Sequence, residues 1–227
     1  MTRIIYVHVP KCGGSSFGAA LRLRFVLSQA SVDLNQGDPR LTGTAQIIDD
    51  YANRQKQLAD LVHRGVRMIS GHVQYSRALH GGVAREYAFV TLLRDPVERF
   101  VSHYNYLQRR HPDPTRPDGL EGFLATADAA RLAAQYQFYF APNAPTETAV
   151  STAISNLSRF TVVGNLARPD VFAGDLRKLI GTPLPRWRRN IAPHPTQVPA
   201  NLRAQIETLC AGDIAIFRAL HGNRQAA

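Results

Sequence analysis

The chain has 227 residues, enough for one domain or one domain with a small elaboration, and too few for two full domains to fit comfortably. It is 44% hydrophobic and 19% charged, so it can bury a core and is not a disordered tail. Its net charge of +10 predicts an anionic partner, such as a nucleotide phosphate, an acidic glycan, nucleic acid or a membrane surface. Arginine supplies 24 of the 27 basic residues. It suits bidentate capture of phosphate or sulfate, although a genome-wide bias in composition would give the same count.

Apolar runs alternate with segments of helical spacing along the chain. Strands are predicted at residues 3–9, 66–70, 86–93 and 160–164. Helices are predicted at residues 17–27, 45–63, 96–110, 118–140, 146–158, 168–180 and 200–220. The stretches 29–44, 111–119 and 181–199 are polar or proline-rich and are predicted to be irregular. Strands that alternate with helices imply βαβ units, so we predict a single α/β domain over residues 1–227, with a central parallel sheet flanked by helices in three layers.

Several classes of protein are excluded by what the sequence lacks. It has no run of 18 apolar residues, so no transmembrane helix is expected. Residues 1–10 lack the features of a signal peptide. Cys12 and Cys210 are far apart and neither belongs to a CxxC pair, so we expect neither a disulfide framework nor a zinc site. The expected compartment is the reducing cytoplasm.

The first candidate site is the loop PKCGGSS between a predicted strand and a predicted helix. Gly13 and Gly14 allow backbone N–H groups to approach an anion, and the helix end adds partial positive charge. Lys11 can reach the edge of a phosphate, and Ser15 or Ser16 can donate a hydroxyl. In a nucleotide P-loop the lysine follows the glycines, whereas Lys11 precedes them, so the match to an ATPase or GTPase is poor. The alternative is a glycine turn that only lets the helix pack tightly.

The second candidate site combines an arginine at a predicted strand end with a serine on the helix that follows. Arg94 follows a buried strand, where open α/β sheets place their ligands, and Ser102 lies about two turns along the next helix. Together they can hold one anion. The alternatives are an ion pair of Arg94 with Asp95 or Glu98, and an ordinary serine on a helix surface. Asp95 is also the predicted N-cap of that helix, with proline after it.

A histidine follows a third predicted strand end. His72 comes after Gly71, in line with the two other sites, where an imidazole can meet a substrate hydroxyl as a general base. A lone histidine is more often structural, and other histidines compete. His8 lies inside the first strand and is predicted to pack, and His103 adjoins Ser102.

Three motifs together resemble the sulfotransferase superfamily: HVPKCGGSSF after the first strand, GHVQY in the middle and LLRDPVERFVSHYNY after the third strand. The likeness is greatest to carbohydrate sulfotransferases of the heparan sulfate 2-O type, and it extends in order and spacing over residues 3–106. Residues 160–181, RWRRN and DIAIF resemble the family's late strand and helix, cofactor-side loop and closing helix. The resemblance implies a P-loop-like fold and sulfuryl transfer from 3′-phosphoadenosine 5′-phosphosulfate (PAPS) to an acceptor hydroxyl, expected on a carbohydrate.

The resemblance also implies roles for individual residues. His72 would be the general base, and Lys11 would stabilise charge on the leaving oxygen. The first loop would hold the 5′-phosphosulfate, the Arg94 segment would hold the 3′-phosphate, and no metal would be needed. The implied donor-binding residues are Lys11, Cys12, Gly13, Gly14, Ser15, Ser16, Phe17, Arg94 and Ser102. Residues 186–189 would close over the nucleotide, with Trp187 or Phe17 near the adenine, or would be a solvated basic turn.

The sequence departs from the family in some respects. Cys12 stands where the first loop usually has threonine, and Ser70 stands where the 2-O enzymes have a second histidine. Without the Golgi anchor of the animal enzymes, the chain is similar to a compact cytoplasmic bacterial member. Residues 29–44 and 111–145 are long insertions, and we expect them to form the acceptor side of the site.

Three other functions stay open. A P-loop kinase or nucleotide hydrolase would use Asp95 for Mg²⁺. A basic nucleic-acid-binding module would fit the high arginine content, but the arginines are scattered and no helix-turn-helix or stacking motif is present, so nucleic acid is not the expected partner. The third is a sulfotransferase fold that has lost its activity.

Overall fold

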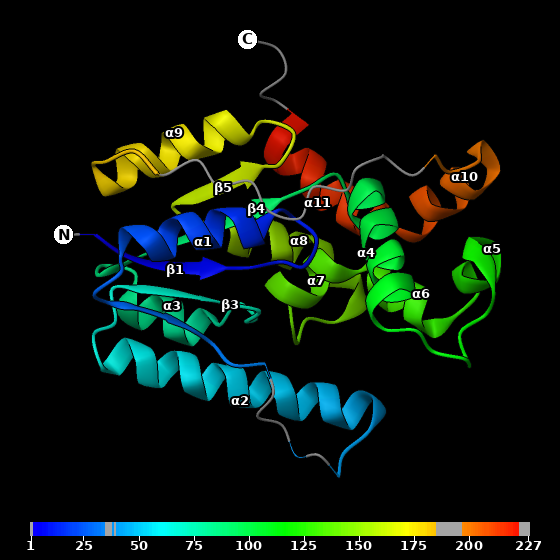
Figure 1. Ribbon diagram of the computed structural model, residues 1–227, viewed down its shortest axis with the longest axis horizontal. Coiled ribbons are helices and arrows are strands. Elements are labelled where there is room, and N and C mark those ends of the chain that lie inside the picture. Colours follow the sequence, from blue (N-terminus) through cyan, green and yellow to red (C-terminus); the bar gives the residue numbers. More distant parts are fainter. Residues whose placement is uncertain (1, 35–37, 39, 185–196, 223–227) are drawn as a thin grey trace.

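The computed structural model describes residues 2–34, 38, 40–184 and 197–222. Its centre is a five-stranded sheet in the order β2-β3-β1-β4-β5, and every neighbouring pair of strands is parallel (Figure 1). The strands are β1 (Arg3–Val7), β2 (Gln29–Ser31), β3 (Met68–Gly71), β4 (Tyr87–Leu93) and β5 (Val162–Asn165). The α/β fold with a central parallel sheet is as predicted.

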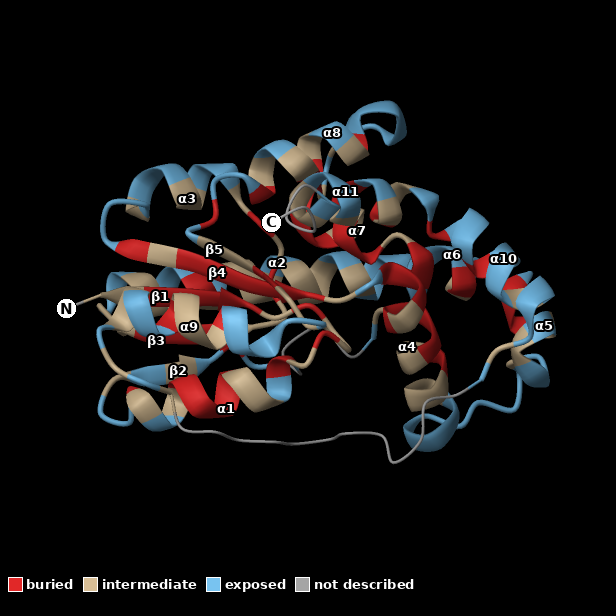
Figure 2. Ribbon diagram, turned by 90° about the horizontal axis from the view of Figure 1, so that it is seen from above, coloured by how far each residue is buried: buried red, intermediate tan, exposed pale blue. Residues whose placement is uncertain are grey.

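Helices cover both faces of this sheet, which produces the three predicted layers (Figure 2). Successive residues of β1 point to opposite faces, because side chains alternate along a strand. Ile4 and Tyr6 pack with α1 and α9. Ile5 and Val7 pack in the larger cluster, which includes residues of α2, α7, α8 and α11. The helices are α1 (Gly14–Arg24), α2 (Gly43–His63), α3 (Arg77–Val83), α4 (Pro96–Arg110), α5 (Gly119–Leu124), α6 (Ala127–Ala133), α7 (Gln135–Phe140), α8 (Thr146–Leu157), α9 (Pro169–Ile180), α10 (Ala200–Leu209) and α11 (Ala211–His221).

A smaller hydrophobic cluster joins α4, α5, α6 and α10 beside the sheet (Figures 1 and 2). Phe100 and Phe123 are its largest fully buried hydrophobic side chains. The strands point toward α4, so the carboxyl edge of the sheet faces this cluster (Figure 1). In open α/β sheets that edge is where ligands bind.

The structure corrects several boundaries. Two short elements, β2 and α3, were not predicted. β2 is polar and gains its structure only by pairing with β3. The helix predicted over 118–140 is three helices, partly because the Thr126 hydroxyl accepts from the amide of Ala129 at 3.1 Å and starts α6 afresh. The predicted last helix is interrupted at Cys210, between α10 and α11. Most of the stretch 181–199 lies outside the described residues.

No helix within the described ranges is both long and apolar enough to cross a membrane.

Candidate active site

The turn between β1 and α1 has an uncapped helix start. Lys11 and Gly13 both adopt positive φ, at 64° and 73°. α1 then begins at Gly14, and it has neither a side-chain cap nor an acidic residue in its first turn. The first N–H groups of a helix lack intrahelical partners and carry partial positive charge. This turn can therefore bind an anion with its backbone.

The second glycine of the turn is required by His8, which was predicted inside the first strand but lies just after the end of β1. A Cβ atom at Gly14 would lie 1.9 Å from the imidazole ring of His8. The tight packing that the sequence left open as an alternative is therefore present at Gly14. At Gly13 the positive φ is a separate reason for glycine.

His72 is held in one tautomer by the backbone just after β1. Its Nδ1 atom lies 2.6 Å from the carbonyl oxygen of His8. Because a carbonyl oxygen only accepts, Nδ1 carries the hydrogen and the lone pair is on Nε2. The two imidazole rings also stack, with centroids 4.4 Å apart and an angle of 26° between their planes. His8 was predicted to be a packed histidine, and the structure shows that its packing partner is His72.

Burial lowers the pKa of His72 to about 4, although the bond to the His8 carbonyl works in the opposite direction. Burial also lowers the pKa of His8, to about 3, with a further contribution from His72. Both rings are therefore neutral near pH 7. Neutral His72, with its free lone pair on Nε2, is able to accept a proton.

An arginine of α2 contacts the backbone of His72. Arg54 donates to the carbonyl oxygen of His72 at 3.4 Å and to that of Leu34 at 3.3 Å. Its guanidinium carbon lies 4.4 Å from the centroid of the Tyr51 ring. Arg54 belongs to no motif, so no pattern in the sequence singles it out.

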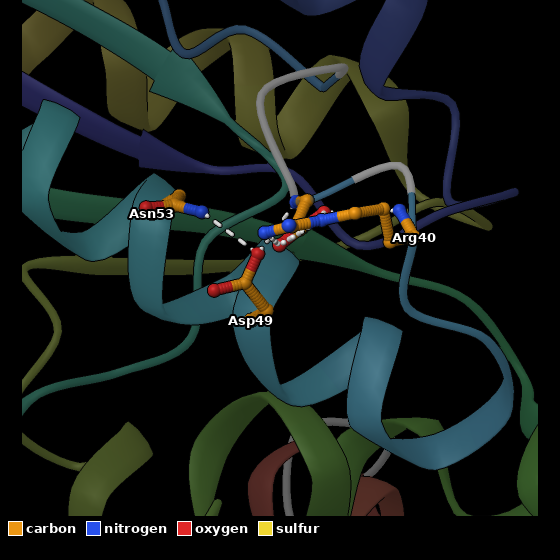
Figure 3. A network of polar contacts seen from close by, with 4 residues as sticks. Arg40, Asp49 and Asn53 are labelled. Carbon is orange, nitrogen blue, oxygen red and sulfur yellow. Dashed lines mark hydrogen bonds and ion pairs between the residues drawn. The ribbon is translucent and has the colours of Figure 1, made fainter.

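The segment that precedes α2 is attached to that helix. The amide of Asp38 donates to Oδ2 of Asp49 at 2.8 Å, and the side-chain amide of Asn53 donates to the same oxygen at 3.1 Å (Figure 3). Arg40 pairs with Asp38 at 2.6 Å (Figure 3). Part of the predicted acceptor-side stretch 29–44 is thus fixed to the helix that carries Arg54.

Lys11 extends from the first turn toward α4. Its Nζ atom lies 4.2 Å from the centroid of the Tyr106 ring. Burial lowers the pKa of Lys11, and the positive charges of Arg109 and Arg94 lower it further. An anion bound among these three cations would relieve their mutual repulsion.

The Arg94 side chain makes one of the ion pairs that the sequence left open. A guanidinium nitrogen lies 3.7 Å from Oε2 of Glu98, and Glu98 also pairs with Arg203 at 3.1 Å. Ser102 is half-buried on α4. In the part of the chain that the structure describes, no hydrogen bond joins Arg94 to Ser102.

Two predicted donor-binding residues have side chains in the core or in the helical layer. The Cys12 thiol is buried 3.8 Å from the hydroxyl of Tyr136, and burial raises its pKa to about 11. Cys12 can therefore serve a ligand only through its backbone. Phe17 packs edge-on against Phe172 of α9, with ring centroids 4.9 Å apart. Trp187 and the rest of 186–189 lie outside the described residues.

One tyrosine connects the two strand-end turns. Besides facing Cys12, the Tyr136 hydroxyl accepts from the amide of Arg94 at 3.0 Å and donates to the carbonyl oxygen of the same residue. The backbone of Tyr136 is held in turn by α11, because its amide donates to the buried carboxylate of Asp213 at 2.8 Å. Sequence reasoning missed both Tyr136 and Asp213.

His103 is a further histidine near the site. Burial lowers its pKa to about 3, and the nearby charges of Arg99 and Lys11 lower it further. Its Nδ1 atom is buried without a hydrogen-bond partner among the described residues. The only signal for it in the sequence was its position next to Ser102.

A site at the carboxyl ends of parallel strands, where a glycine-rich turn enters a helix, is typical of P-loop-like α/β enzymes. Comparison with known proteins identifies the family: residues 2–137 match the model of the Sulfotransferase family, and the chain belongs to it. A crystal structure of a sulfotransferase from Alicyclobacillus acidocaldarius has a similar fold, with a TM-score of 0.52 over 97% of this chain and 95% of that chain. The two sequences are 16% identical, so this likeness concerns the fold. A search of curated proteins found no match.

Proposed function

We propose that this sulfotransferase-family enzyme moves the sulfuryl group of PAPS to an acceptor hydroxyl, with His72 as the general base. The observation that carries the proposal is the bond from Nδ1 of His72 to the carbonyl oxygen of His8, at 2.6 Å. It leaves the basic Nε2 lone pair free at the edge of the sheet where the uncapped turn and Lys11 also lie. A base must be neutral to accept a proton, and the lowered pKa of His72 keeps it neutral at physiological pH, although a pKa of about 4 makes it a weaker base than an ordinary histidine.

The residues present suit an anionic donor. The start of α1 offers backbone N–H groups with no acidic residue in the first turn. Lys11 lies close enough to Arg94 and Arg109 for their charges to lower its pKa. We assign the 5′-phosphate to the backbone of Gly13, Gly14, Ser15 and Ser16, and the 3′-phosphate to Arg94 and Ser102. When bound, the donor supplies an activated sulfuryl group.

In the proposed reaction a bond forms between the acceptor oxygen and sulfur. The bond between sulfur and the bridging oxygen of the 5′-phosphate breaks, and its electron pair stays on that oxygen. His72 takes the acceptor proton on Nε2, and Lys11 stabilises the charge that develops on the bridging oxygen. The chain's main contribution is to position these groups, as in phosphoryl transfer.

We propose a saccharide as the acceptor. The motif resemblance to carbohydrate sulfotransferases and the net charge of +10 both support it. The 2-O enzymes have a second histidine at the position of Ser70, so we do not propose heparan sulfate itself as the acceptor of this chain.

Of the alternatives, a magnesium-dependent kinase is disfavoured by Asp95. One oxygen of its carboxylate accepts from the amides of Val97 at 3.0 Å and Glu98 at 3.1 Å, so this residue caps α4. Its N-cap role is a sufficient explanation for an aspartate at this strand end.

Calorimetric titration with adenosine 3′,5′-bisphosphate, AMP and ATP, without magnesium, tests the proposal. We expect binding that requires the 3′-phosphate. Equal binding of ATP, or no binding of the bisphosphate, would overturn the proposed donor and return the kinase and nucleic-acid functions to consideration.

A further inference from the structure

A polar cavity of about 250 Å³ lies between α1 and the strands β1 and β3. Two glycines make the room for it: Gly14 and Gly18 line it from α1, one helical turn apart. A Cβ atom at Gly18 would lie 3.3 Å from a guanidinium nitrogen of Arg22 and 3.6 Å from the Tyr6 ring. Tyr6 and Ser70 line the cavity from the sheet, where they are paired in register on neighbouring strands.

One tyrosine that lines this cavity has most of its side chain in the core. Tyr6 is 1% exposed, and its hydroxyl is not engaged in a hydrogen bond with the described residues, so it is available to the cavity. Buried tyrosine hydroxyls usually have a partner. Burial raises the pKa of Tyr6, so the hydroxyl keeps its proton and can donate it to a ligand.

The charge of the cavity is also unbalanced. Arg22 lines it and makes no ion pair within the described ranges; its contact is a long hydrogen bond of 3.4 Å to the Ser70 hydroxyl. No acidic residue lines the cavity. The remaining titratable side chain, His8, is neutral near pH 7 because its pKa is lowered to about 3. The walls therefore offer one cation and several hydroxyl donors.

We propose that this cavity binds a small oxyanion or a carboxylate, with Arg22 as the counter-charge and the hydroxyls of Tyr6 and Ser70 as donors. Tyr6 and Ser70 lie on β1 and β3, two residues before the stacked pair His8 and His72 that follows the strand ends, so the site lies one layer of side chains behind the proposed base. The ligand has two possible sources, a free ion such as sulfate or the acidic substituent of an acceptor. The binding itself does not depend on the proposed donor.

Titrations with sodium sulfate, sodium glucuronate and glucose, at ionic strength matched with sodium chloride, test this site. We expect sulfate or glucuronate to bind the wild type and glucose not to bind. Arg22→Gln should weaken anion binding by about 10–100-fold, the scale of a charge-assisted hydrogen bond, and Tyr6→Phe by about 2–10-fold. Tighter binding of glucuronate than of sulfate would indicate that the cavity takes the acidic group of a sugar. Tighter binding of sulfate would indicate that it takes a free ion.

Two control variants separate this cavity from other sites. Arg24→Gln removes a neighbouring arginine that bonds Thr182 instead, at 2.6 Å, and should leave the affinity unchanged. Lys11→Ala removes a cation of the donor turn, where an anion can also bind, and should leave in place the binding that depends on Arg22. The inference is overturned if neither anion binds, if Arg22→Gln binds as wild type does, or if Lys11→Ala abolishes binding. If the anions bind as expected while the bisphosphate does not, the proposed function falls and this site stands.

Discussion

The two strand-to-helix turns at the carboxyl edge of the sheet are built in opposite ways. The turn into α1 has no side-chain cap and no acidic residue, and it contains two residues with positive φ. The turn into α4 is capped by Asp95, has proline in its first turn and carries Glu98 there as well. The first turn leaves its backbone N–H groups and their positive charge available. The second satisfies its own backbone, so an anion near it must be held by side chains such as Arg94.

This contrast assigns different tasks to the two turns. The first lies beside the stacked pair of His8 and His72, and in the proposed function it would serve the reacting end of the donor. The second would serve a more distant charge. Substitutions on the first side should change turnover, and those on the second should change affinity or helix stability.

The largest effect is expected at His72. His72→Ala should lower kcat by about 10²–10⁴-fold, the usual contribution of a general base, while the affinity for adenosine 3′,5′-bisphosphate stays unchanged. His80→Ala is the matched control, since that ring contacts the carbonyl oxygen of Arg159 at 3.3 Å. Near-normal turnover in His72→Ala would remove this residue from the mechanism.

The pH profile gives a second readout for His72. Because its pKa is lowered to about 4, the base is neutral above that value and protonated below it. kcat/KM of the wild type should therefore fall as pH drops through about 4, with no loss between pH 7 and 5 due to this group. A loss centred near the ordinary histidine value of about 6.5 would contradict the buried, neutral state described above.

Arg94→Ala should weaken binding of the 3′,5′-bisphosphate by about 1.5–3 kcal/mol, the scale of a charge-assisted hydrogen bond. The affinity for AMP, which lacks the 3′-phosphate, should stay the same. Calorimetry of both nucleotides measures the difference. An equal loss for both would show that Arg94 does not recognise the 3′-phosphate.

Gly14→Ala should lower the free energy of unfolding by about 1–3 kcal/mol, because the added methyl group overlaps the His8 ring. In the His8→Ala background the overlap is absent, so adding Gly14→Ala should lower the free energy of unfolding by less than it does in the wild type. Chemical denaturation of the four proteins gives the coupling energy. Strictly additive effects would show that the ring is not what requires glycine at this position.

The smallest effect is expected at the cap of α4. Asp95→Ala removes the acceptor for two amides and should destabilise the protein by about 1 kcal/mol, whereas Asp95→Asn keeps the cap and should cost less. Thermal unfolding compares the two. A stable Asp95→Ala variant with unchanged unfolding would weaken the contrast between the turns.

Local signals in the sequence predicted much of this arrangement. The cap and proline at Asp95 and Pro96 predicted the start of α4 at the residue observed. The apolar runs predicted four of the five strands, and their alternation with helices predicted that the strands pair in parallel. β2 was missed because its three residues, two of them polar, become a strand only through hydrogen bonds to β3, which lies far away in the sequence.

The candidate site was predictable where it follows a strand end and hidden where it depends on long-range contacts. His72 and Arg94 lie directly after strands, and Lys11 lies in the turn between β1 and α1. The partner of His72 is a backbone carbonyl 64 positions earlier, which no side-chain pattern can indicate. Arg54 lies in the middle of a helix, and nothing in its spacing separates it from a surface arginine.

The contact between Tyr136 and α11 bears on how this protein can be shortened or recombined. The family match ends at residue 137. The matched segment contains every residue that the proposed function uses to bind the donor or to accept the proton. Yet the amide of Tyr136 is held by Asp213, 77 positions further along the chain. A fragment that stops after the matched segment would keep the proposed site residues. It would lose the Asp213 carboxylate that holds Tyr136, the residue whose hydroxyl contacts both turns. The matched segment is therefore not expected to work as an independent module, and a graft without α11 should keep the proposed site residues but lose the contact that holds Tyr136 in place.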